Sequence, residues 1–592
     1  MRTLLLITSY LLSILEPKAQ IEISHESGFY STPIEVSLQH PDPEVILYYS
    51  LDGTTPGRNG QRYSLPLILT SDATSPTLSY IRTGEDWQRP TGGVEKGHTL
   101  KVVGFKNENQ ITPVLSRFYF IQPNHLDKYP IDRLALTIDS AGFFSQEKGI
   151  YVPGNNEMLN FYQGGEAWER PVLFELFDDT GKLEWSQQLG ARIHGRSSRT
   201  NPQKSLRLYA RSEYGSPFMF HPIFGEYGAS AQKRLILRAP DRLFSKALFI
   251  DEVVHAAAED LSVENMASRP VAVFINGEYW GLQNLRERHD EQYLRIKYGV
   301  EPDDVDIIDW DRGPAVAEGN LTEYNSLLFF LASTDISSPQ GYQELKKRVN
   351  MDSFIPFVGT HLFFANEDFP NNNLRMWRER TYGEKWNFFF YDCDGCMRDM
   401  EMDSFKMFSE MKNDGNPASN MIRELLKNSE FTSELYSYLN SVIANQFSTS
   451  QLLNLISDRE SFYAPLITDH INRWHSPDDN AEWFSAITVA EQFAMNRPRI
   501  MGELLEKHLG KPYVIYPIPA KTEFYLEFEN NPEDMDVRVS ISDMNGKTFS
   551  PARIYTSESR VNIPLEGMSQ GVYLIQVIVG KSIYYDKLIV AN

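Results

Sequence analysis

The spacing of apolar residues changes near the middle of the chain, and this change limits the possible folds more than any other feature. From 126 to about 290, short runs such as RLALTID and RPVAVFING show the alternation and β-branched residues of strands. From 321 to 364 and from 403 to 510, apolar residues recur at helical spacing. A β-rich half followed by a helical half predicts a multidomain α+β protein whose core is bilobal, with a cleft between the lobes.

Two segments of this core carry more specific predictions. The stretch SKALFIDEVVHAAAEDL at 245–261 has apolar residues spaced for one buried stripe of a helix. The acid-rich run DDVDIIDWD at 303–311 lacks the glycine and glutamate spacing of a calcium-binding EF-hand loop. We therefore expect an amphipathic helix at the first segment and a solvated loop before a helix at the second.

The regions on either side of the core have strand patterns. A chain of 592 residues is too long for one hydrophobic core. Residues 21–122 and 514–592 contain short alternating runs separated by turn signals, such as HPDP and DGTTP in the first region. We expect a small β-sandwich in each region, flanking a central domain at 126–510.

The chain is acidic, with 57 Lys and Arg residues against 79 Asp and Glu residues and a formal charge of −22. This charge disfavours binding to the phosphate backbone of nucleic acids, and it favours cations or basic polypeptides as partners. The hydrophobic fraction of 41% and the aromatic fraction of 12% are those of a folded protein.

The first 19 residues have the layout of a secretory signal peptide. Arg2 precedes an apolar run from Leu4 to Leu15, and Ala19 is a small residue at a plausible cleavage point. The run is apolar on all faces, which argues against an amphipathic surface helix. Because no later stretch reaches the length of a membrane span, we expect a mature protein without a transmembrane segment, secreted or attached to the cell surface.

Acidic and amide side chains surround a run of aromatic residues between 365 and 397. The segment ANEDFPNNNLRMW contains Asp368, Asn372 and Asn373, and the segment KWNFFFYDCDGCM contains Asp392 and Asp394. WNFFFY predicts a buried strand, and the two aspartates after it would point to opposite faces, one of them toward the cleft. Carboxylate and amide oxygens are hard ligands suited to Mg²⁺. Asp368 precedes Asn373 by five positions, which is the spacing of the base and the metal-holding asparagine in protein-kinase catalytic loops.

Cys393 and Cys396, the two cysteines of the chain, lie in the same acidic loop. Two cysteines cannot form a four-cysteine zinc site, and a redox site would be expected at a helix N-terminus. We expect two packed thiols or a small local disulfide.

A basic segment, ARIHGRSSRTNPQKSLRLYAR, lies at 191–211 of this acidic chain. Strand alternation places Lys204 on the opposite face from Arg207, so that Lys204 is able to reach a cleft while its strand stays packed. Clamping of phosphate by Lys204, Arg199 and Arg207 is one interpretation, and a solvated basic face is the other. His194 and His255 are expected to be structural.

The core resembles the CotH family of atypical, secreted or coat-associated protein kinases. It does so in five segments that occur in the family's order: RIHGRSSRTNPQKSLRL, ILRAPDRLFSKALFIDEVVHAAAEDL, RPVAVFINGEYWGLQNLRERHDEQYL, NEDFPNNNLRMWRER and KWNFFFYDCDGCM. The resemblance implies a kinase-like fold that uses ATP and Mg²⁺ and phosphorylates Ser or Thr hydroxyls of a secreted or surface protein. The residues it implies are a catalytic Asp368, a phosphate-facing Lys204, a nucleotide-pocket Glu287, and metal ligands at Asp392, Asn373, Asp394 and Asn372.

The flanking regions resemble two other families. GFYSTPIEVSLQHPDPEVILYYSLDGTTPG resembles the β-sandwich attached to chitobiases and hexosaminidases, which implies an accessory module able to contact glycan. DMNGK, GVYLIQV and the terminal KLIV resemble the sorting domain of type IX secretion cargo, which implies the type IX secretion machinery as a partner.

Two departures from the CotH pattern leave other functions open. Gly395 directly follows Asp394, where the family commonly continues to an aromatic residue, and Tyr391 replaces a tryptophan before Asp392. The first alternative is a catalytically inactive kinase-like scaffold that binds glycan or protein at the cell surface. The second is a carbohydrate-active enzyme with Asp368 and Asp392 as its acid–base pair.

Overall fold

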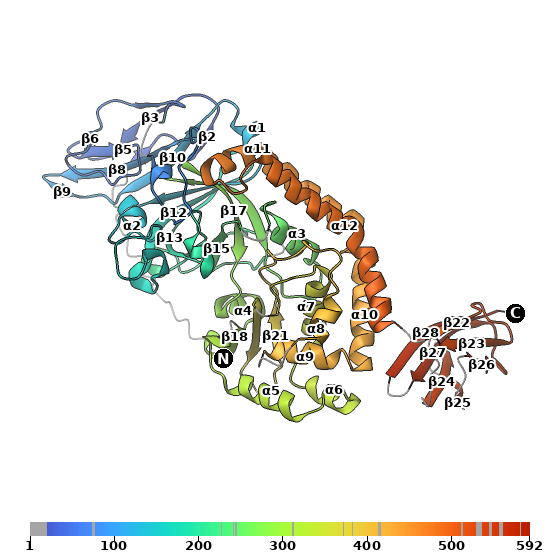
Figure 1. Ribbon diagram of the computed structural model, residues 1–592. Coiled ribbons are helices and arrows are strands. Elements are labelled where there is room, and N and C mark those ends of the chain that lie inside the picture. The colour runs from blue at the N-terminus through green and yellow to red at the C-terminus, as the bar shows by residue number, and fades with distance from the viewer. Residues whose placement is uncertain are drawn as a thin grey trace, which may run out of the picture.

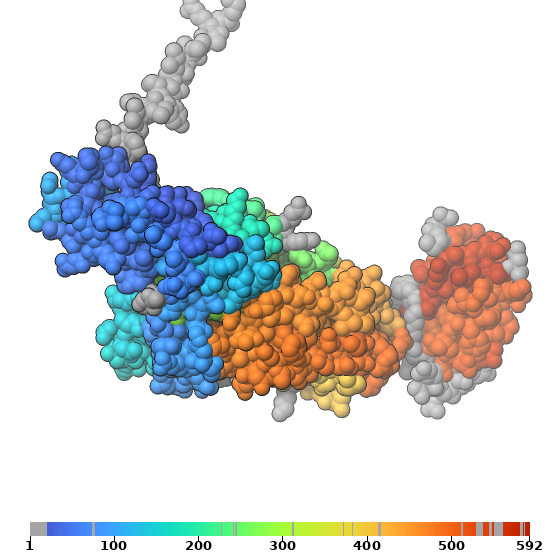
Figure 2. Space-filling model, turned by 90° about the horizontal axis from the view of Figure 1, so that it is seen from above, coloured from blue at the N-terminus to red at the C-terminus, as the bar shows by residue number. Residues whose placement is uncertain are grey.

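Groups of strands and a group of long helices follow one another along the chain (Figure 1). The structure is a computed structural model, and it describes residues 21–73, 77–225, 228–240, 242, 245–310, 313–370, 372–381, 383–411, 416–510, 513–528, 536–543, 547–555, 560–579 and 582–591. The expected signal peptide at 1–19 lies outside these residues. The N-terminal and C-terminal β domains lie at opposite ends of the molecule (Figure 2).

The N-terminal domain consists of sheets that share one core. A sheet with the order β2-β10-β8-β5-β6, extended by β9 beside β8, packs against the small sheets β1-β4 and β3-β7. Val36 and Leu69 of the small sheets and Leu100 and Val102 of the large sheet are buried in this core. The strands are β1 (Glu22–Ile23), β2 (Gly28–Tyr30), β3 (Ile34–Val36), β4 (Leu38–Gln39), β5 (Ile46–Ser50), β6 (Gln61–Arg62), β7 (Leu67–Leu69), β8 (His98–Lys106), β9 (Asn109–Gln110) and β10 (Leu115–Ile121).

A closed barrel follows, with the strand order β11-β12-β13-β14-β15-β17-β16. A parallel pairing of β11 with β16 closes it, and the other neighbours are antiparallel. Leu134, Phe174, Leu206 and Leu237 are buried inside and fill it with apolar side chains. The strands are β11 (Arg133–Ile138), β12 (Arg170–Phe177), β13 (Leu183–Ile193), β14 (Leu206–Tyr209), β15 (Arg234–Arg238), β16 (Ser268–Ile275) and β17 (Glu278–Glu287).

Aromatic rings join the N-terminal domain to the barrel. The ring centroid of Phe29 is 5.4 Å from that of Phe118 and 5.2 Å from that of Phe120, both in its own domain. It is also 5.4 Å from the centroid of Phe177 and 5.5 Å from that of Phe274, both in the barrel. The two domains therefore share one apolar core and form a single packed unit.

A buried carboxyl lies in the same interface. The hydroxyl of Ser27 donates to Oε1 of Glu175 at 2.5 Å, and Glu175 is 1% exposed. Burial raises the pKa of Glu175 to about 7, against the opposing effects of the Ser27 hydrogen bond and the Arg117 charge. The carboxyl is therefore protonated in the folded protein below neutral pH.

This carboxyl predicts a pH dependence of stability. Because its pKa is higher in the folded state than in the unfolded state, the free energy of unfolding should fall as pH rises from about 4.5 to about 7. Glu175→Gln removes the ionisation, so at pH 8 the variant should be more stable than wild type by about 3 kcal/mol, and the two should converge below pH 4.5. Urea unfolding at a series of pH values measures the difference, and a difference that does not vary with pH would refute the prediction.

The barrel has a charged outer face on β14, β15 and β17. Arg207 pairs with Ile236 and Ile236 pairs with Arg286 across these strands. Because side chains alternate along a strand, Leu206 and Leu208 point into the barrel while Arg207 points out. The outer face is directed toward the helices that follow.

Helix α3 (Ile250–Ala257) packs beside β17 and against α11. The expectation of a helix from 245 to 261 with one buried stripe is corrected here. The helix is shorter, and Asp251 and Glu252 are buried together with Val253 and Val254. The barrel and α11 cover it from different sides, so its acidic residues need partners inside the protein.

Helices occupy most of the chain between 322 and 509, including both ranges with helical spacing. α12 packs against α11 and leads toward the C-terminal domain (Figure 1). The helices that follow the barrel are α4 (Glu291–Tyr298), α5 (Thr322–Ser333), α6 (Pro339–Leu345), α7 (Met351–Phe363), α8 (Ser404–Ser409), α9 (Pro417–Leu425), α10 (Ser429–Ala444), α11 (Thr449–Trp474) and α12 (Asn480–Leu509). Two short helices, α1 (His125–Lys128) and α2 (Ser140–Phe144), precede α3 in the chain.

A sheet with the order β19-β18-β20-β21 holds the segment with acidic and aromatic residues. β20 (Leu374–Glu379) begins directly after Asn373, and β21 (Asn387–Phe389) ends shortly before Asp392. Phe388 contacts Phe354 of α7 with a centroid distance of 4.9 Å, and Phe389 stacks on His289 at 4.5 Å. Both faces of β21 are therefore buried, and the polar loops start where its burial ends.

The expectation of a solvated loop at 303–311 was wrong. Val305–Trp310 forms β18, which pairs with β20 and with β19 (Pro314–Glu318). Asp306 is 1% exposed and accepts from Nε of Arg380 at 2.9 Å. Asp309 accepts from Nε of Arg375 at 2.5 Å. Arginines near or on β20 satisfy the acidic side chains, so the acid-rich run is able to form a strand.

The C-terminal domain consists of the sheets β22-β23-β26 and β25-β24-β27-β28, which share one core. Leu526 and Ile575 are fully buried between them. The strands are β22 (Tyr513–Tyr516), β23 (Glu523–Phe528), β24 (Asp536–Asp543), β25 (Thr548–Tyr555), β26 (Arg560–Pro564), β27 (Gly571–Val579) and β28 (Ser582–Val590).

Candidate functional site

Three carboxylates from distant parts of the sequence meet between the barrel and the helices. Asp251 comes from α3, and Asp392 and Asp394 come from the loop after β21. One carboxylate oxygen of each lies within 4.8 Å of the others. The backbone N–H of Cys393 donates to Oδ1 of Asp251 at 2.6 Å, which fixes the loop to the helix.

Arginines of the outer barrel face compensate the negative charge of Asp251, Asp392 and Asp394, which together form the acidic cluster. Nη2 of Arg238 lies 3.0 Å from Oδ1 of Asp392 and also contacts Asp394. Nη2 of Arg286 lies 2.5 Å from Oδ2 of Asp251. Burial alone would raise the pKa of Asp251, but the charges of Arg286 and Arg238 outweigh it and hold that pKa well below its ordinary value. Asp251 is therefore a carboxylate.

The loop between α7 and β20 lies against this cluster. Oδ1 of Asp368 accepts from Nδ2 of Asn372 at 2.7 Å, and Oδ2 of Asp368 accepts from Nδ2 of Asn373 at 3.3 Å. Nδ2 of Asn373 also donates to the backbone oxygen of Asp392 at 3.0 Å. Asn373 has a φ of 60° and Asp392 a φ of 59°. Both residues adopt the left-handed conformation, which is tolerated for these residue types and is common at functional sites.

Buried groups hold the loop in place. Arg497 of α12 is fully buried and donates to the backbone oxygens of Leu362 and Phe363 at the end of α7, at 2.9 Å and 2.8 Å. Oδ1 of Asn366 accepts from the N–H of Asp368 at 3.0 Å. Nδ2 of Asn366 lies 3.8 Å from Sγ of Cys393. The position of Asp368 is thus set by both α7 and the acidic loop.

The structure contains the local disulfide, Cys393–Cys396. Both cysteines are fully buried. The bridge closes the loop that carries Asp392 and Asp394, and it restricts the conformations available to that loop.

Arg207, His194 and Arg288 form a basic niche next to the acidic cluster. Nε of Arg207 donates to Nδ1 of His194 at 2.9 Å. Burial, followed by the charges of Arg207, Arg288 and Arg238, lowers the pKa of His194 well below its ordinary value, so His194 is neutral. Burial and the nearby Arg288 likewise lower the pKa of Arg207. In the part of the chain described here, no carboxylate lies within ion-pair distance of Arg207, which makes this niche a favourable place for an anion.

Lys204 does not lie in the basic niche. Its Nζ donates to the backbone oxygens of Arg199 and Asn201 at 2.6 Å and 2.7 Å and lies 4.2 Å from the ring centroid of Phe161. Burial lowers the pKa of Lys204 to about 7. Lys204 and Arg207 lie on opposite faces, as the alternation in the sequence predicted. However, the face that Lys204 shares with Leu206 points into the barrel.

Two further candidates have structural contacts. Nε of Arg199 donates to the backbone oxygen of Gly195 at 2.6 Å, and its Nη1 donates to the backbone oxygens of Phe161 and Tyr162. Glu287 is 1% exposed and accepts from the N–H of Ala229 at 2.7 Å. It also accepts from the N–H of Ala267 and from Gln232, so it joins two loops to β17.

Sequence reasoning missed Asp251, Arg238 and Arg286. The sequence contains only a weak signal for these residues. Asp251 and Glu252 are adjacent acidic residues in an otherwise apolar helix, and Arg238 ends the apolar strand RLILR. A charged residue inside an apolar run requires a buried partner, and that requirement could have identified them.

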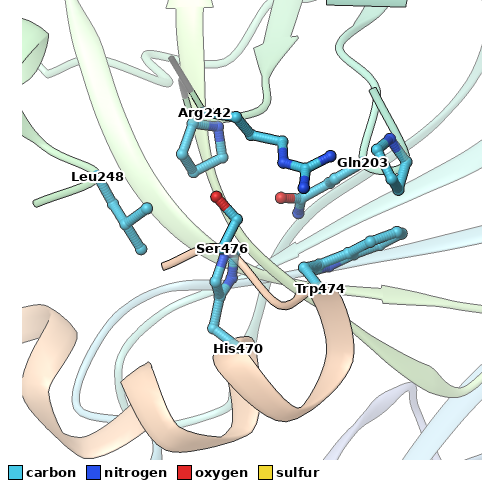
Figure 3. A pocket seen from close by; sticks show the side chains of 8 residues that line it. Gln203, Arg242, Leu248, His470, Trp474 and Ser476 are labelled. Carbon is cyan, nitrogen blue, oxygen red and sulfur yellow. The ribbon is translucent and has the colours of Figure 1, made fainter. Parts of the chain in front are cut away.

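Two pockets near the candidate site differ in size. A pocket of about 10 Å³ lies between Gln203, Arg242, His470, Trp474 and their neighbours (Figure 3), and it has room for about one water molecule. A second pocket, of about 400 Å³, lies between α3, α12 and the loop at 396–399. Glu367, which precedes Asp368 in the chain, and Cys396 of the disulfide loop line it.

Comparison with known families identifies the core. The model of the CotH kinase protein family matches residues 191–501, more than half of the 592-residue chain. The chain belongs to the CotH kinase family. The resemblance noted in the sequence is thereby confirmed for the core of this CotH-family protein.

The flanking resemblances are confirmed as well. Residues 514–591 match the secretion system C-terminal sorting domain, which indicates a secreted or cell-surface protein. Residues 25–88 match the chitobiase/β-hexosaminidase C-terminal domain. Within the described residues, every helix is too short or too polar to cross a membrane.

Other comparisons add little. No relative was found among the curated proteins that were compared with the chain. Among solved structures, the twitchin kinase region from C. elegans is 9% identical, with 95% of this chain and 99% of that chain covered and a TM-score of 0.14.

Proposed function

We propose that this CotH-family protein is an exported protein kinase that transfers the γ-phosphoryl group of ATP to Ser or Thr hydroxyls of a secreted or surface protein. The amide of Asn373 carries the proposal, because it binds both the Asp368 carboxylate and the backbone of Asp392. This bond supports placing the proposed base, Asp368, and the proposed metal-binding carboxylates in one site, as phosphoryl transfer requires. The barrel would form one lobe and the region from α4 onward the other.

Asp368 would orient the acceptor hydroxyl and take its proton. Its carboxylate is 2.7 Å from the Asn372 amide and 3.3 Å from the Asn373 amide, and these bonds fix its direction. The 400 Å³ pocket, lined by the neighbouring Glu367, would be the approach for the acceptor.

Asp251, Asp392 and Asp394 would hold Mg²⁺, and the amide oxygen of Asn373 would complete the set. Their oxygens are hard ligands at a mutual distance that one ion can bridge, so the residues present fit the metal. When bound, Mg²⁺ would neutralise charge on the phosphate oxygens. Arg207 and Arg288 would bind the phosphates from the barrel side, in the role that the sequence suggested for Lys204.

Nucleotide-dependent thermal stabilisation tests the proposal. ATP with Mg²⁺ should raise the melting temperature of wild type by several degrees, because ligands that bind the folded state alone stabilise it. The shift should require Mg²⁺ and should disappear in Asp392→Ala, whose cluster lacks a ligand. Asp352→Ala, an exposed change in the first turn of α7, is the matched control and should retain the shift.

The alternatives give different results in the same experiment. Binding to glycan without a shift by any nucleotide would favour the inactive scaffold. Hydrolysis of a chromogenic glycoside that is lost in Asp368→Ala would favour the carbohydrate-active enzyme.

A further inference from the structure

The guanidinium group of Arg238 lies among the three carboxylates of the acidic cluster. Its Nη2 is 3.0 Å from Asp392 and in contact with Asp394, and its Nε is 4.0 Å from Asp251. These are the same carboxylates that lie close enough together to share one ion. Arg238 therefore occupies the place where their negative charge is concentrated.

This arrangement opposes metal binding. Arg238 and Arg286 compensate most of the charge of Asp251, Asp392 and Asp394. A divalent ion that bound these oxygens would bring its charge close to the guanidinium of Arg238, and both would compete for the same lone pairs. The ion binds well only if Arg238 moves away.

Arg238 also lies close to the basic niche around Arg207 and His194. It lies on the same outer barrel face as Arg207, and its charge acts on His194 together with those of Arg207 and Arg288. It is thus located between the acidic cluster and the basic niche. A phosphate bound in that niche offers Arg238 anionic oxygens in exchange for the carboxylates.

We propose that Arg238 is a resident counter-cation that occupies the carboxylate cluster until a metal–nucleotide complex enters, and then transfers its bonds to phosphate. The proposal rests on the proposed function for the identity of the incoming ligand. It implies that the metal alone binds weakly, and that metal and nucleotide strengthen each other's binding by the same factor. An enzyme built in this way does not retain free divalent ions at its site without nucleotide.

Calorimetric titration with Mn²⁺ alone, without nucleotide, tests this inference. Arg238→Gln should bind Mn²⁺ at least about tenfold more tightly than wild type, because the competing charge is gone. The matched control is Arg269→Gln. Arg269 also bridges two carboxylates, Asp132 at 2.5 Å and Glu184 at 2.6 Å, and is 18% exposed against 23% for Arg238. Its substitution should leave the Mn²⁺ affinity unchanged.

Thermal melting keeps the test decisive if Arg238→Gln is destabilised. Without metal the variant should melt well below wild type, because its carboxylates repel one another, and Mn²⁺ should raise its melting temperature more than that of wild type. Equal or weaker Mn²⁺ binding by Arg238→Gln, or a loss of stability that Mn²⁺ does not restore, would overturn the inference. Since nucleotide is absent from both measurements, a failure of the proposed kinase activity would not produce either result.

Discussion

Asp368→Asn is expected to lower the rate of phosphate transfer by a factor of about 10² to 10⁴, which is the usual contribution of a positioned general base. Asparagine cannot accept the hydroxyl proton, and its single acceptor oxygen can keep one of the two hydrogen bonds from Asn372 and Asn373. ATP affinity should change little, because the metal cluster and the arginines remain in place. Transfer of radiolabelled γ-phosphate to a basic model protein, and to the protein itself, measures the loss.

The control for this substitution is Asp352→Asn, which removes an exposed carboxylate from the first turn of α7 without touching the site. It should transfer phosphate at the wild-type rate. If Asp368→Asn were as active as this control, Asp368 would have no part in proton transfer or in orienting the acceptor.

Phe29→Ala should reduce the free energy of unfolding by about 3 to 5 kcal/mol, the range for buried Phe→Ala substitutions. Phe29 is 7% exposed, and its ring contacts Phe118 and Phe120 on one side and Phe177 and Phe274 on the other. The cavity would lie in the interface between the N-terminal domain and the barrel, so both domains should lose stability. Urea unfolding followed by tryptophan fluorescence measures this effect.

Phe220→Ala provides the comparison, since Phe220 is 73% exposed and its loss should cost less than about 0.5 kcal/mol. If Phe29→Ala behaved like Phe220→Ala, the N-terminal domain would be an independent appendage. A large effect would show that this domain supports the core, a role that its resemblance to an accessory module does not suggest.

The part of the site that lies within one stretch of sequence could be predicted. Asp368, Asn372 and Asn373 share a short loop, and Asp392 and Asp394 follow a strand that pairs with the next element after that loop. Local spacing and the burial of Phe388 and its neighbours were enough to suggest that these groups converge. The structure links them through the Asn373 amide.

The remainder depends on contacts between distant segments. Whether Lys204 or Arg207 faces the helices is decided by closure of the barrel, which pairs β11 with β16 at residues about 140 positions apart. Asp251 and Arg238 join the site from a helix and a strand whose patterns indicate only burial. The acid-rich β18 was misread because arginines that follow it by some 65 to 75 positions satisfy its aspartates.

The most direct test of the account is a crystal structure with Mn²⁺ and a non-hydrolysable ATP analogue. We expect an anomalous peak among the carboxylates of Asp251, Asp392 and Asp394, with the phosphates beside Arg207 and the terminal phosphate facing Asp368. A metal or nucleotide bound elsewhere, with Arg238 still held by the two aspartates, would contradict it.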